Sequence, residues 1–282
     1  MKPVRLGLDS FSYNLTIEDP DAPRDTFWFL ERCARLGLDG CQLDPRHVRK
    51  RDAERRLWDE GFLRKVGDFC RRHGLYLELG DWRFGEEALT QHLELAAEVG
   101  ARSLRTFYGG RRHKMSAAEI AAGVEESIRG LAALAPVAER VRVPLALENH
   151  EEFTSAEIIR IIEAVGSPYV LACLDSGNGM MVGEDPLECT RALAPYAAAV
   201  HLKDWVVREE GGEPRWEDRV LGRGDARAAE AYAVLREANP DLPITIENPT
   251  WGSSRAVTKE DEDRNVVESV AFARSLAGRH PR

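Results

Sequence analysis

Two patterns of apolar and polar residues alternate along the whole chain. Short apolar runs that finish in polar residues predict β-strands, and the stretches between them, with apolar residues three and four positions apart, predict amphipathic helices. The predicted strands cover residues 4–11, 40–44, 75–79, 103–107, 144–149, 170–175, 198–203 and 243–248. Their spacing along the chain is typical of right-handed βαβ units.

Helix boundaries support this division of the chain. Thr154 and Glu157 form a capping box at the start of one predicted helix. A glycine, which tolerates left-handed backbone, follows the helical pattern at Gly37, Gly74, Gly100 and Gly166. No Pro-, Ser- or Gly-rich linker interrupts the pattern, so we expect a single domain over residues 1–282. Eight βα units in one α/β domain predict a (β/α)8 TIM barrel; the doubly wound alternative lacks its GxGxxG signature after the first strand.

Composition and charge narrow the function classes. The hydrophobic fraction of 43% is typical of a folded protein, and no apolar run is long enough to span a bilayer. The formal net charge of -9 argues against binding to duplex nucleic acid through a broad basic face. The N-terminus lacks the apolar stretch of a secretory signal, so we expect a cytoplasmic protein. Its five cysteines are scattered without a CxxC motif, which predicts buried thiols and excludes a disulfide framework.

The ends of the predicted strands are unusually polar. In a barrel all strand carboxyl ends converge on one mouth, where polar side chains are candidates for chemistry. The polar residues at these ends are Asp9, Ser10, Gln42, Asp44, Glu78, Arg105, Thr106, Glu148, Asp175, His201, Lys203 and Glu247. We therefore expect a polar site at the mouth of the barrel.

Glu148, Asp175, His201 and Glu247 stand at the apolar-to-polar step of the fifth to eighth predicted strands. Any one of them alone would be an ordinary loop-capping residue, but four on successive strands form a pattern. Buried carboxylates that lie together repel one another, so a cation is expected among them. A nearby lysine or arginine is one candidate, but a divalent metal explains the added histidine better. The donor set favours Mn²⁺, with Mg²⁺, Co²⁺ and Zn²⁺ as alternatives.

The segments LENHEEFTS, EAVGSPYVLACLDSGN, EDPLECTRALAPY and HLKD resemble the xylose isomerase-like TIM-barrel superfamily, which includes sugar phosphate isomerases and epimerases. The resemblance extends over essentially the whole chain and implies a metal site at Glu148, Asp175, His201 and Glu247. In the ketose epimerases of this superfamily, the first and last glutamates also move protons on opposite faces of the substrate. The resemblance therefore implies catalytic roles for Glu148 and Glu247, and a homo-dimer or tetramer.

The DNA-repair nucleases of the same superfamily differ from this chain at two points. They carry Asp-x-x-His after the sixth strand and bind three zinc ions, whereas Asn178 stands here in the place of that histidine. The second predicted strand offers Gln42 and Asp44 where those nucleases supply a histidine. Together with the acidic net charge, this argues against nucleic acid as a substrate.

Strand alternation predicts two further catalytic candidates. His150 shares the side of Glu148, and Lys203 shares the side of His201. His150 titrates near neutrality and would move protons, unless it bonds a loop carbonyl. Lys203 would hold a substrate oxygen, unless it forms a salt bridge to the carboxylates of the mouth.

Substrate contacts are expected from residues around the mouth. The candidates are Arg105, Asn178, Trp205 and Trp251, of which the tryptophans would stack on a sugar unless they serve plain packing. The loop 108–113 combines glycines with cationic residues, which is typical either of an anion cradle or of a flexible basic loop. The long segment 205–224 is a candidate lid.

These features predict an enzyme that uses one divalent metal ion, Mn²⁺ by preference, on a small-molecule carbohydrate. The expected reaction is isomerisation or epimerisation through a metal-stabilised enediolate, with Glu148 and Glu247 exchanging the proton. The motifs are also similar to those of 3-oxo-isoapionate decarboxylases and, more distantly, of C-glycoside-cleaving lyases. Decarboxylation or elimination on a 3-oxo sugar acid or 3-oxo glycoside is therefore the alternative. A catalytically silent sugar-binding protein is disfavoured because both glutamates are present. No membrane or nucleic-acid partner is expected.

Overall fold

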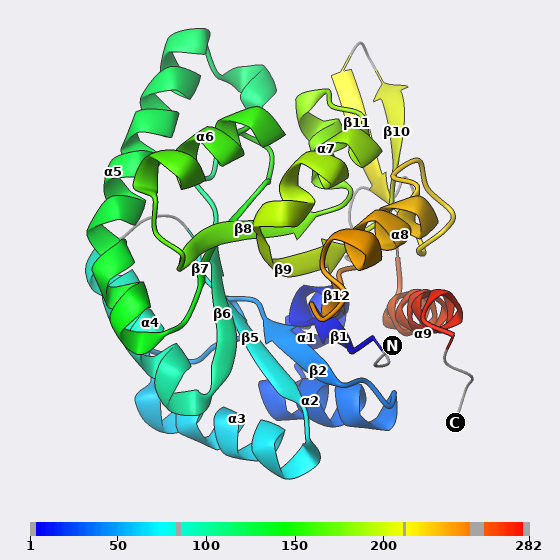
Figure 1. The fold of residues 1–282 in the computed structure, drawn as a ribbon. Helices are drawn as coiled ribbons and strands as arrows, with labels where there is room; N and C mark the ends of the chain where they lie inside the picture. Colours follow the sequence, from blue (N-terminus) through cyan, green and yellow to red (C-terminus); the bar gives the residue numbers. More distant parts are fainter. Residues whose placement is uncertain (1–3, 83–85, 211–212, 249–256, 279–282) are drawn as a thin grey trace.

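The computed structural model describes residues 4–82, 86–210, 213–248 and 257–278. Eight parallel strands close into a barrel in the order β1-β12-β9-β8-β7-β6-β5-β2 (Figure 1). They are β1 (Leu6–Asp9), β2 (Gly40–Leu43), β5 (Tyr76–Gly80), β6 (Ala101–Thr106), β7 (Leu145–Glu148), β8 (Val170–Asp175), β9 (Ala197–Leu202) and β12 (Ile244–Ile246). The predicted TIM barrel is confirmed, and each predicted strand is found with its ends shifted by no more than a few residues.

Helices surround the barrel on its outer side (Figure 1). They are α1 (Asn14–Ile17), α2 (Thr26–Arg35), α3 (Glu60–His73), α4 (Glu86–Val99), α5 (Ala117–Val141), α6 (Ser155–Val165), α7 (Pro186–Leu193), α8 (Ala228–Ala238) and α9 (Lys259–Leu276). Short 3-10 helices are η1 (Ser10–Tyr13), η2 (Arg112–Lys114), η3 (Asn178–Val182) and η4 (Ala194–Tyr196). The capping box of Thr154 and Glu157 begins α6 as predicted. Among the described residues, no helix combines the length and apolar character that a membrane span requires.

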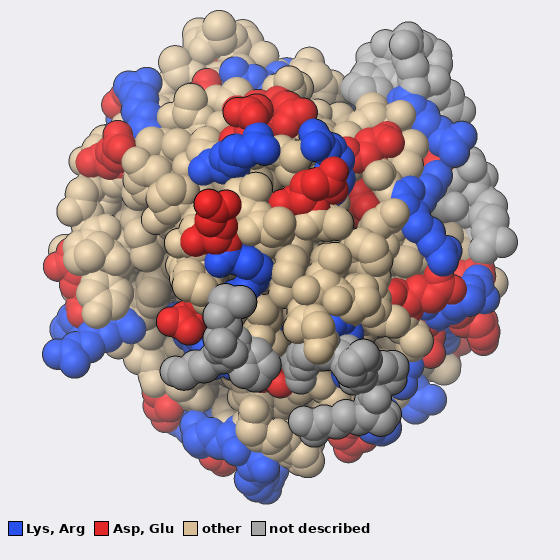
Figure 2. Space-filling model, turned by 45° about the vertical axis from the view of Figure 1, so that its right-hand side comes forward, with Lys and Arg blue, Asp and Glu red and all other residues tan. Residues whose placement is uncertain are grey.

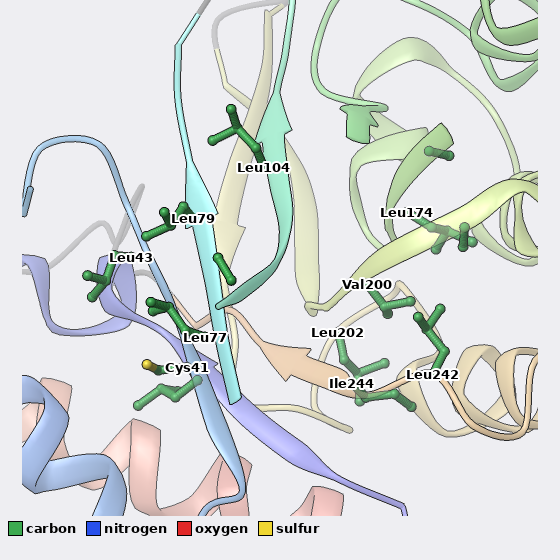
Figure 3. Close-up of a cluster of buried hydrophobic side chains, with 14 of the residues drawn as sticks. Cys41, Leu43, Leu77, Leu79, Leu104, Leu174, Val200, Leu202, Leu242 and Ile244 are labelled. Carbon is green, nitrogen blue, oxygen red and sulfur yellow. The ribbon is translucent and has the colours of Figure 1, made fainter. Parts of the chain in front are cut away.

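The main hydrophobic core lies between the strands and the helices. Side chains that alternate outward from the barrel strands, such as Leu77, Leu104, Val200 and Ile244, are fully or almost fully buried in it (Figure 3). The five cysteines are free and buried, as the sequence predicts. Burial of these apolar surfaces is the main source of stability of the barrel, at roughly 25 cal/mol per Å².

The interior of the barrel is filled with smaller side chains on the side of β7, β8 and β9. The inward-pointing residues Ala146, Cys173 and Ala199 form their own buried cluster. They lie two positions before Glu148, Asp175 and His201, respectively. On the other side, the ring of Tyr76 occupies the space in front of Gly7 and Gly40, where any added Cβ atom would collide with it. The inward positions nearest the mouth are thereby left to polar side chains.

Two hairpins were not predicted from the sequence. They are the pair β3 (Lys50–Asp52) and β4 (Leu57–Trp58), and the pair β10 (Trp205–Glu210) and β11 (Glu213–Asp218), both antiparallel. Figure 1 shows β10 and β11 extending away from the barrel. Charged residues of both signs are interspersed over the face of the molecule in Figure 2.

Candidate active site

Strand geometry brings the four candidate metal ligands together. Glu148, Asp175 and His201 point inward from the ends of β7, β8 and β9, and Glu247 directly follows β12. Asp175 and His201 are partners in the register of β8 and β9. One ligand atom from each of the four buried residues lies within 4.8 Å of all the others. The sequence-predicted cluster therefore exists in space.

The ring of His201 is oriented by a neighbour on β2. Its Nε2 lies 2.9 Å from Oε1 of Gln42, and because this amide oxygen only accepts, we assign the ring hydrogen to Nε2. The lone pair of Nδ1 then faces the carboxylates. Nδ1 lies 2.8 Å from Oε2 of Glu247, but the contact lacks hydrogen-bond geometry and Nδ1 has no hydrogen-bond partner. A histidine that binds a metal is usually fixed in this way through its other ring nitrogen.

Asp175 is fixed through one oxygen and leaves the other free of hydrogen bonds. Its Oδ1 accepts hydrogen bonds from the backbone N–H groups of Gly177 and Asn178, at 2.8 and 2.9 Å. Its Oδ2 is buried without a hydrogen-bond partner. Buried carboxylate oxygens normally find donors, so an oxygen of this kind is suited to binding a cation.

Two buried cations partly neutralise the cluster. Nζ of Lys203 lies 2.9 Å from Oε1 of Glu247 and 3.3 Å from Oδ2 of Asp175, and Nη1 of Arg105 lies 3.3 Å from Oε2 of Glu148. For Lys203, the structure contains the salt bridge that the sequence left as an alternative. Burial alone would raise the pKa of Glu148, but Arg105 and His201 lower it to about 2, so this carboxylate is ionised.

The site still attracts positive charge after these pairings. Burial disfavours protonation of His201, yet its contacts with Cys173, Glu247 and Glu148 raise its pKa well above the ordinary value. An environment that draws a proton onto a buried imidazole also favours a divalent cation in its place. A divalent metal ion therefore fits this set of three carboxylates and one imidazole. Two of the potential ligand atoms in the set have no hydrogen-bond partner.

A cavity of about 200 Å³ opens directly above this cluster. It is lined by Phe11, Asp44, Arg46, Trp82, Arg105, Phe107, Glu148, His150, Glu151, Asn178, Met181, Lys203, Trp205 and Glu247. Three of the four predicted substrate contacts, Arg105, Asn178 and Trp205, are among these residues. Asn178 also donates to Oε1 of Glu148 at 3.2 Å. The fourth candidate, Trp251, lies outside the described residues.

His150 forms part of the wall of this cavity. Its ring stacks on Phe107 with 4.5 Å between the ring centres, and its Nδ1 lies 3.5 Å from Oε2 of Glu152. Burial lowers the pKa of His150, but Glu152 and Glu148 outweigh this effect and raise it. The structure thus provides an imidazole with a favoured proton beside the cavity, in contact with a carboxylate rather than the loop carbonyl considered from the sequence.

The loop 108–113 does bind an anion, but the anion is a carboxylate of the protein itself. The backbone N–H groups of Tyr108 and Gly109 donate to Oε1 of Glu152 at 3.0 and 3.2 Å. Nη1 of Arg112 lies 2.7 Å from Oε2 of Glu157. Because these donors are engaged, the expectation of a cradle for a substrate anion is corrected to a structural anchor.

The segment 205–224 contains the hairpin β10–β11 where a lid was expected. Of its described residues, Trp205 lines the cavity, and Nζ of Lys203 lies 4.7 Å from the centre of its ring. The chain after β11 is held by Asp204, which accepts from the backbone N–H groups of Gly222, Gly224 and Ala226. The segment is therefore anchored at both ends.

Sequence reasoning missed the apolar part of the cavity wall. This part of the wall is formed by Phe11, Trp82 and Phe107. They follow the ends of β1, β5 and β6, respectively, by one or two residues. An aromatic residue directly after a strand end was thus a usable signal. Arg46, whose guanidinium lies over the ring of Phe11, is a further lining residue that was not predicted from the sequence.

Comparison with protein families gives a match over most of the chain. The model of a family described as xylose isomerase-like TIM barrel matches residues 30–276. A curated relative, the 3-oxo-isoapionate decarboxylase of Pectobacterium atrosepticum, is 29% identical over 202 residues, which cover 71% of this chain and 71% of that protein.

Solved structures share the fold at lower identity. D-psicose 3-epimerase from Clostridium cellulolyticum H10, solved with D-tagatose, aligns with a TM-score of 0.75 at 16% identity, over 97% of this chain and 99% of that chain. The IolI protein with a bound zinc atom aligns with a TM-score of 0.72 at 17% identity, over 97% of this chain and 98% of that chain. At these identities the similarity concerns the fold alone.

Proposed function

The chain belongs to the xylose isomerase-like TIM-barrel family, and we propose that it is a metal-dependent enzyme acting on a carbohydrate-derived carbonyl compound. The resemblance identified from the sequence motifs is confirmed by this membership. In the proposed site, Glu148, Asp175, His201 and Glu247 hold one divalent ion, preferably Mn²⁺. The observation that carries the proposal is the convergence of these four buried residues, with Nδ1 of His201 and Oδ2 of Asp175 lacking hydrogen-bond partners.

A divalent cation held there supplies Lewis-acid stabilisation of the negative charge that develops on substrate oxygens. The protein's own residues then handle the proton. Glu148 and Glu247 both line the cavity. Glu148 ends β7 and Glu247 follows β12, and these strands flank β8 and β9 in the barrel. We propose that one removes the proton from the carbon beside the carbonyl, giving an enediolate, and that the other returns it. Return to the neighbouring carbon is isomerisation, and return to the opposite face is epimerisation.

Lys203 is proposed to stabilise the developing oxyanion. Its ammonium group has three donors, and its contact with Glu247 at 2.9 Å uses one of them. Because Nζ also borders the cavity, a further donor is available to a substrate oxygen. Arg105 and Asn178 keep Glu148 ionised and oriented in the same site.

Deuterium incorporation tests this proposal. Keto-sugars incubated with the Mn²⁺-loaded protein in heavy water should gain deuterium at the carbon beside the carbonyl, as followed by proton NMR. New sugar signals would distinguish isomers from epimers. Absence of exchange and of product over a panel of keto-sugars and 3-oxo sugar acids would contradict the proposal.

Decarboxylation of a 3-oxo sugar acid is the second candidate, favoured by the curated decarboxylase relative and by His150. In this reaction the bond to the carboxylate breaks, its electrons form the enediolate, carbon dioxide leaves, and one donor protonates the carbon. His150 is suited to this role because its raised pKa favours a proton at the cavity wall. A His150→Gln variant should then lose about 10²–10⁴-fold in rate. Under the two-glutamate mechanism, the same variant should keep most of its activity.

A further inference from the structure

A second cavity, of about 330 Å³, adjoins the one above the candidate metal site. The two cavities share a wall made of Trp82, Phe107, His150 and Glu151. None of the four candidate metal ligands lines the outer cavity, and its remaining lining residues come from the loop 109–111. A molecule whose reacting part occupies the inner cavity would therefore meet a second space away from the candidate metal ligands.

The charged groups around the outer cavity are already paired within the protein. Nε of Arg111 lies 3.3 Å from Oε2 of Glu151, and both residues line this cavity. The backbone N–H groups of Tyr108 and Gly109 already donate to Glu152, as described above. A phosphate or carboxylate bound there would have to compete with these internal carboxylates. The described lining thus favours a ligand without charge.

The lining of the outer cavity favours a flat group. Trp82 and Phe107 contribute aromatic side chains, and one face of Phe107 is covered by the stacked ring of His150. On the loop side, Gly109 and Gly110 contribute no side chains, and both have a positive φ, 83° and 134°. A Cβ atom on Gly110 would lie 3.1 Å from the sulfur of Met115, so the open space depends on glycine. A lining of aromatic side chains and bare backbone suits a ring with an apolar face.

We propose that the outer cavity is a second subsite that binds an uncharged ring joined to the reacting sugar. The ligand class is a glycoside, in which the second ring is either another sugar or an aromatic aglycone. This inference rests on the proposed function, because that function assigns the reacting sugar to the inner cavity. Binding energy from such a non-reacting ring is available to orient the substrate over the site.

Binding of unreactive sugars tests the subsite without requiring turnover. The probes are D-glucose, phenyl β-D-glucoside and cellobiose, measured by isothermal titration calorimetry with and without added Mn²⁺. We expect at least one of the two-ring probes to bind about 10-fold tighter than glucose, which corresponds to about 1.4 kcal/mol. The phenyl and cellobiose arms distinguish an aromatic aglycone from a second sugar.

Three variants test whether the outer cavity binds the second ring. Trp82→Ala should bring the ratio of two-ring to one-ring affinity close to one, and Phe107→Leu, which keeps an apolar side chain, should lower the same ratio. Trp216→Ala, on the hairpin and outside both cavity linings, should leave the ratio unchanged.

Equal affinity for all three probes in the wild-type protein would overturn the subsite, as would a preference that survives in both Trp82→Ala and Phe107→Leu. Tighter binding of glucose 6-phosphate than of either two-ring probe, lost in Arg111→Gln, would replace it with an anion site. Mn²⁺ binding and deuterium exchange on one-ring keto-sugars are measured separately. Their success alongside equal probe affinities would refute the subsite alone. Their failure alongside a two-ring preference would refute the proposed function and leave only a ring-binding cavity.

Discussion

Gln42 is the residue whose replacement most sharply tests how the site is organised. Its Oε1 accepts from Nε2 of His201 at 2.9 Å and from Nε of Arg105 at 3.3 Å. Its Nε2 lies 3.4 Å from Oε2 of Glu78, to which it donates. Gln42 thus holds the histidine in the tautomer that presents Nδ1 to the cluster, although it is not itself a candidate ligand.

A Gln42→Met variant keeps the length of this side chain and removes its hydrogen bonds. Outer partners of a metal-binding histidine typically contribute 10–100-fold in metal affinity, so we expect Mn²⁺ binding to weaken by about that factor. The buried N–H groups of His201 and Arg105 would also lose their common acceptor. Each unsatisfied buried donor costs roughly 1–3 kcal/mol, so the free energy of unfolding should fall by at least about 1 kcal/mol.

Calorimetric titration of Mn²⁺ and urea denaturation measure the two effects. The matched control is Gln91→Met, because Gln91 also accepts a hydrogen bond, from the backbone N–H of Trp58 at 3.1 Å, but lies outside the site. The control should lose stability and retain Mn²⁺ affinity. If Gln42→Met bound Mn²⁺ as tightly as wild type, the assignment of His201 as a ligand through Nδ1 would be refuted.

Two further predictions concern the glutamate pair and acid stability. Glu247→Gln should retain one Mn²⁺ ion at saturating metal but lose about 10²–10⁴-fold in turnover if Glu247 moves a proton; full rescue by excess metal would leave it a ligand only. Burial lowers the pKa of His47 to about 4, against about 6.5 in the unfolded chain, so the unfolded state takes up the proton first as the pH falls. Wild type should therefore lose about 2 kcal/mol more than His47→Gln in urea denaturation between pH 7 and 5, and equal losses would contradict the effect of burial.

The barrel and its inward polar ends could be predicted from the sequence because strand periodicity fixes both. Each strand must bury one face against the helices, and the switch from apolar to polar residues marks the mouth. The same switch identified Glu148, Asp175, His201 and Glu247, since inward alternation at the ends of neighbouring strands brings side chains together.

The hairpin β10–β11 was not predicted because its sequence lacks the apolar runs that mark the barrel strands. Much of β10 and β11 is charged, as in Arg208 and Arg215, which are register partners, so the pair shows no sustained apolar alternation. The only local signal was the Gly-Gly pair at positions 211–212, which is typical of hairpin turns. Backbone pairing between two strands stabilises such an element without a contribution to the main core.

The anion bound by the loop 108–113 could not be identified from local sequence either. Its glycines and arginines were compatible with an anion cradle and with a flexible basic loop. The bound carboxylate belongs to Glu152, more than 40 positions further along, as in the contact with Tyr108. Only the closure of the barrel, which sets β6 beside β7, brings the two segments together. Contacts between loops of different strands depend on this long-range geometry.

Titration of the metal-stripped protein with Mn²⁺, beside an Asp175→Asn variant, tests the central claim most directly. Asp175 contributes a buried oxygen that has no hydrogen-bond partner, and the variant removes its charge while keeping its size. We predict one Mn²⁺ ion per chain in wild type and clearly weaker binding in the variant. Failure of the folded wild-type protein to bind Mn²⁺ or another divalent ion stoichiometrically, or equal affinity in the variant, would contradict the account.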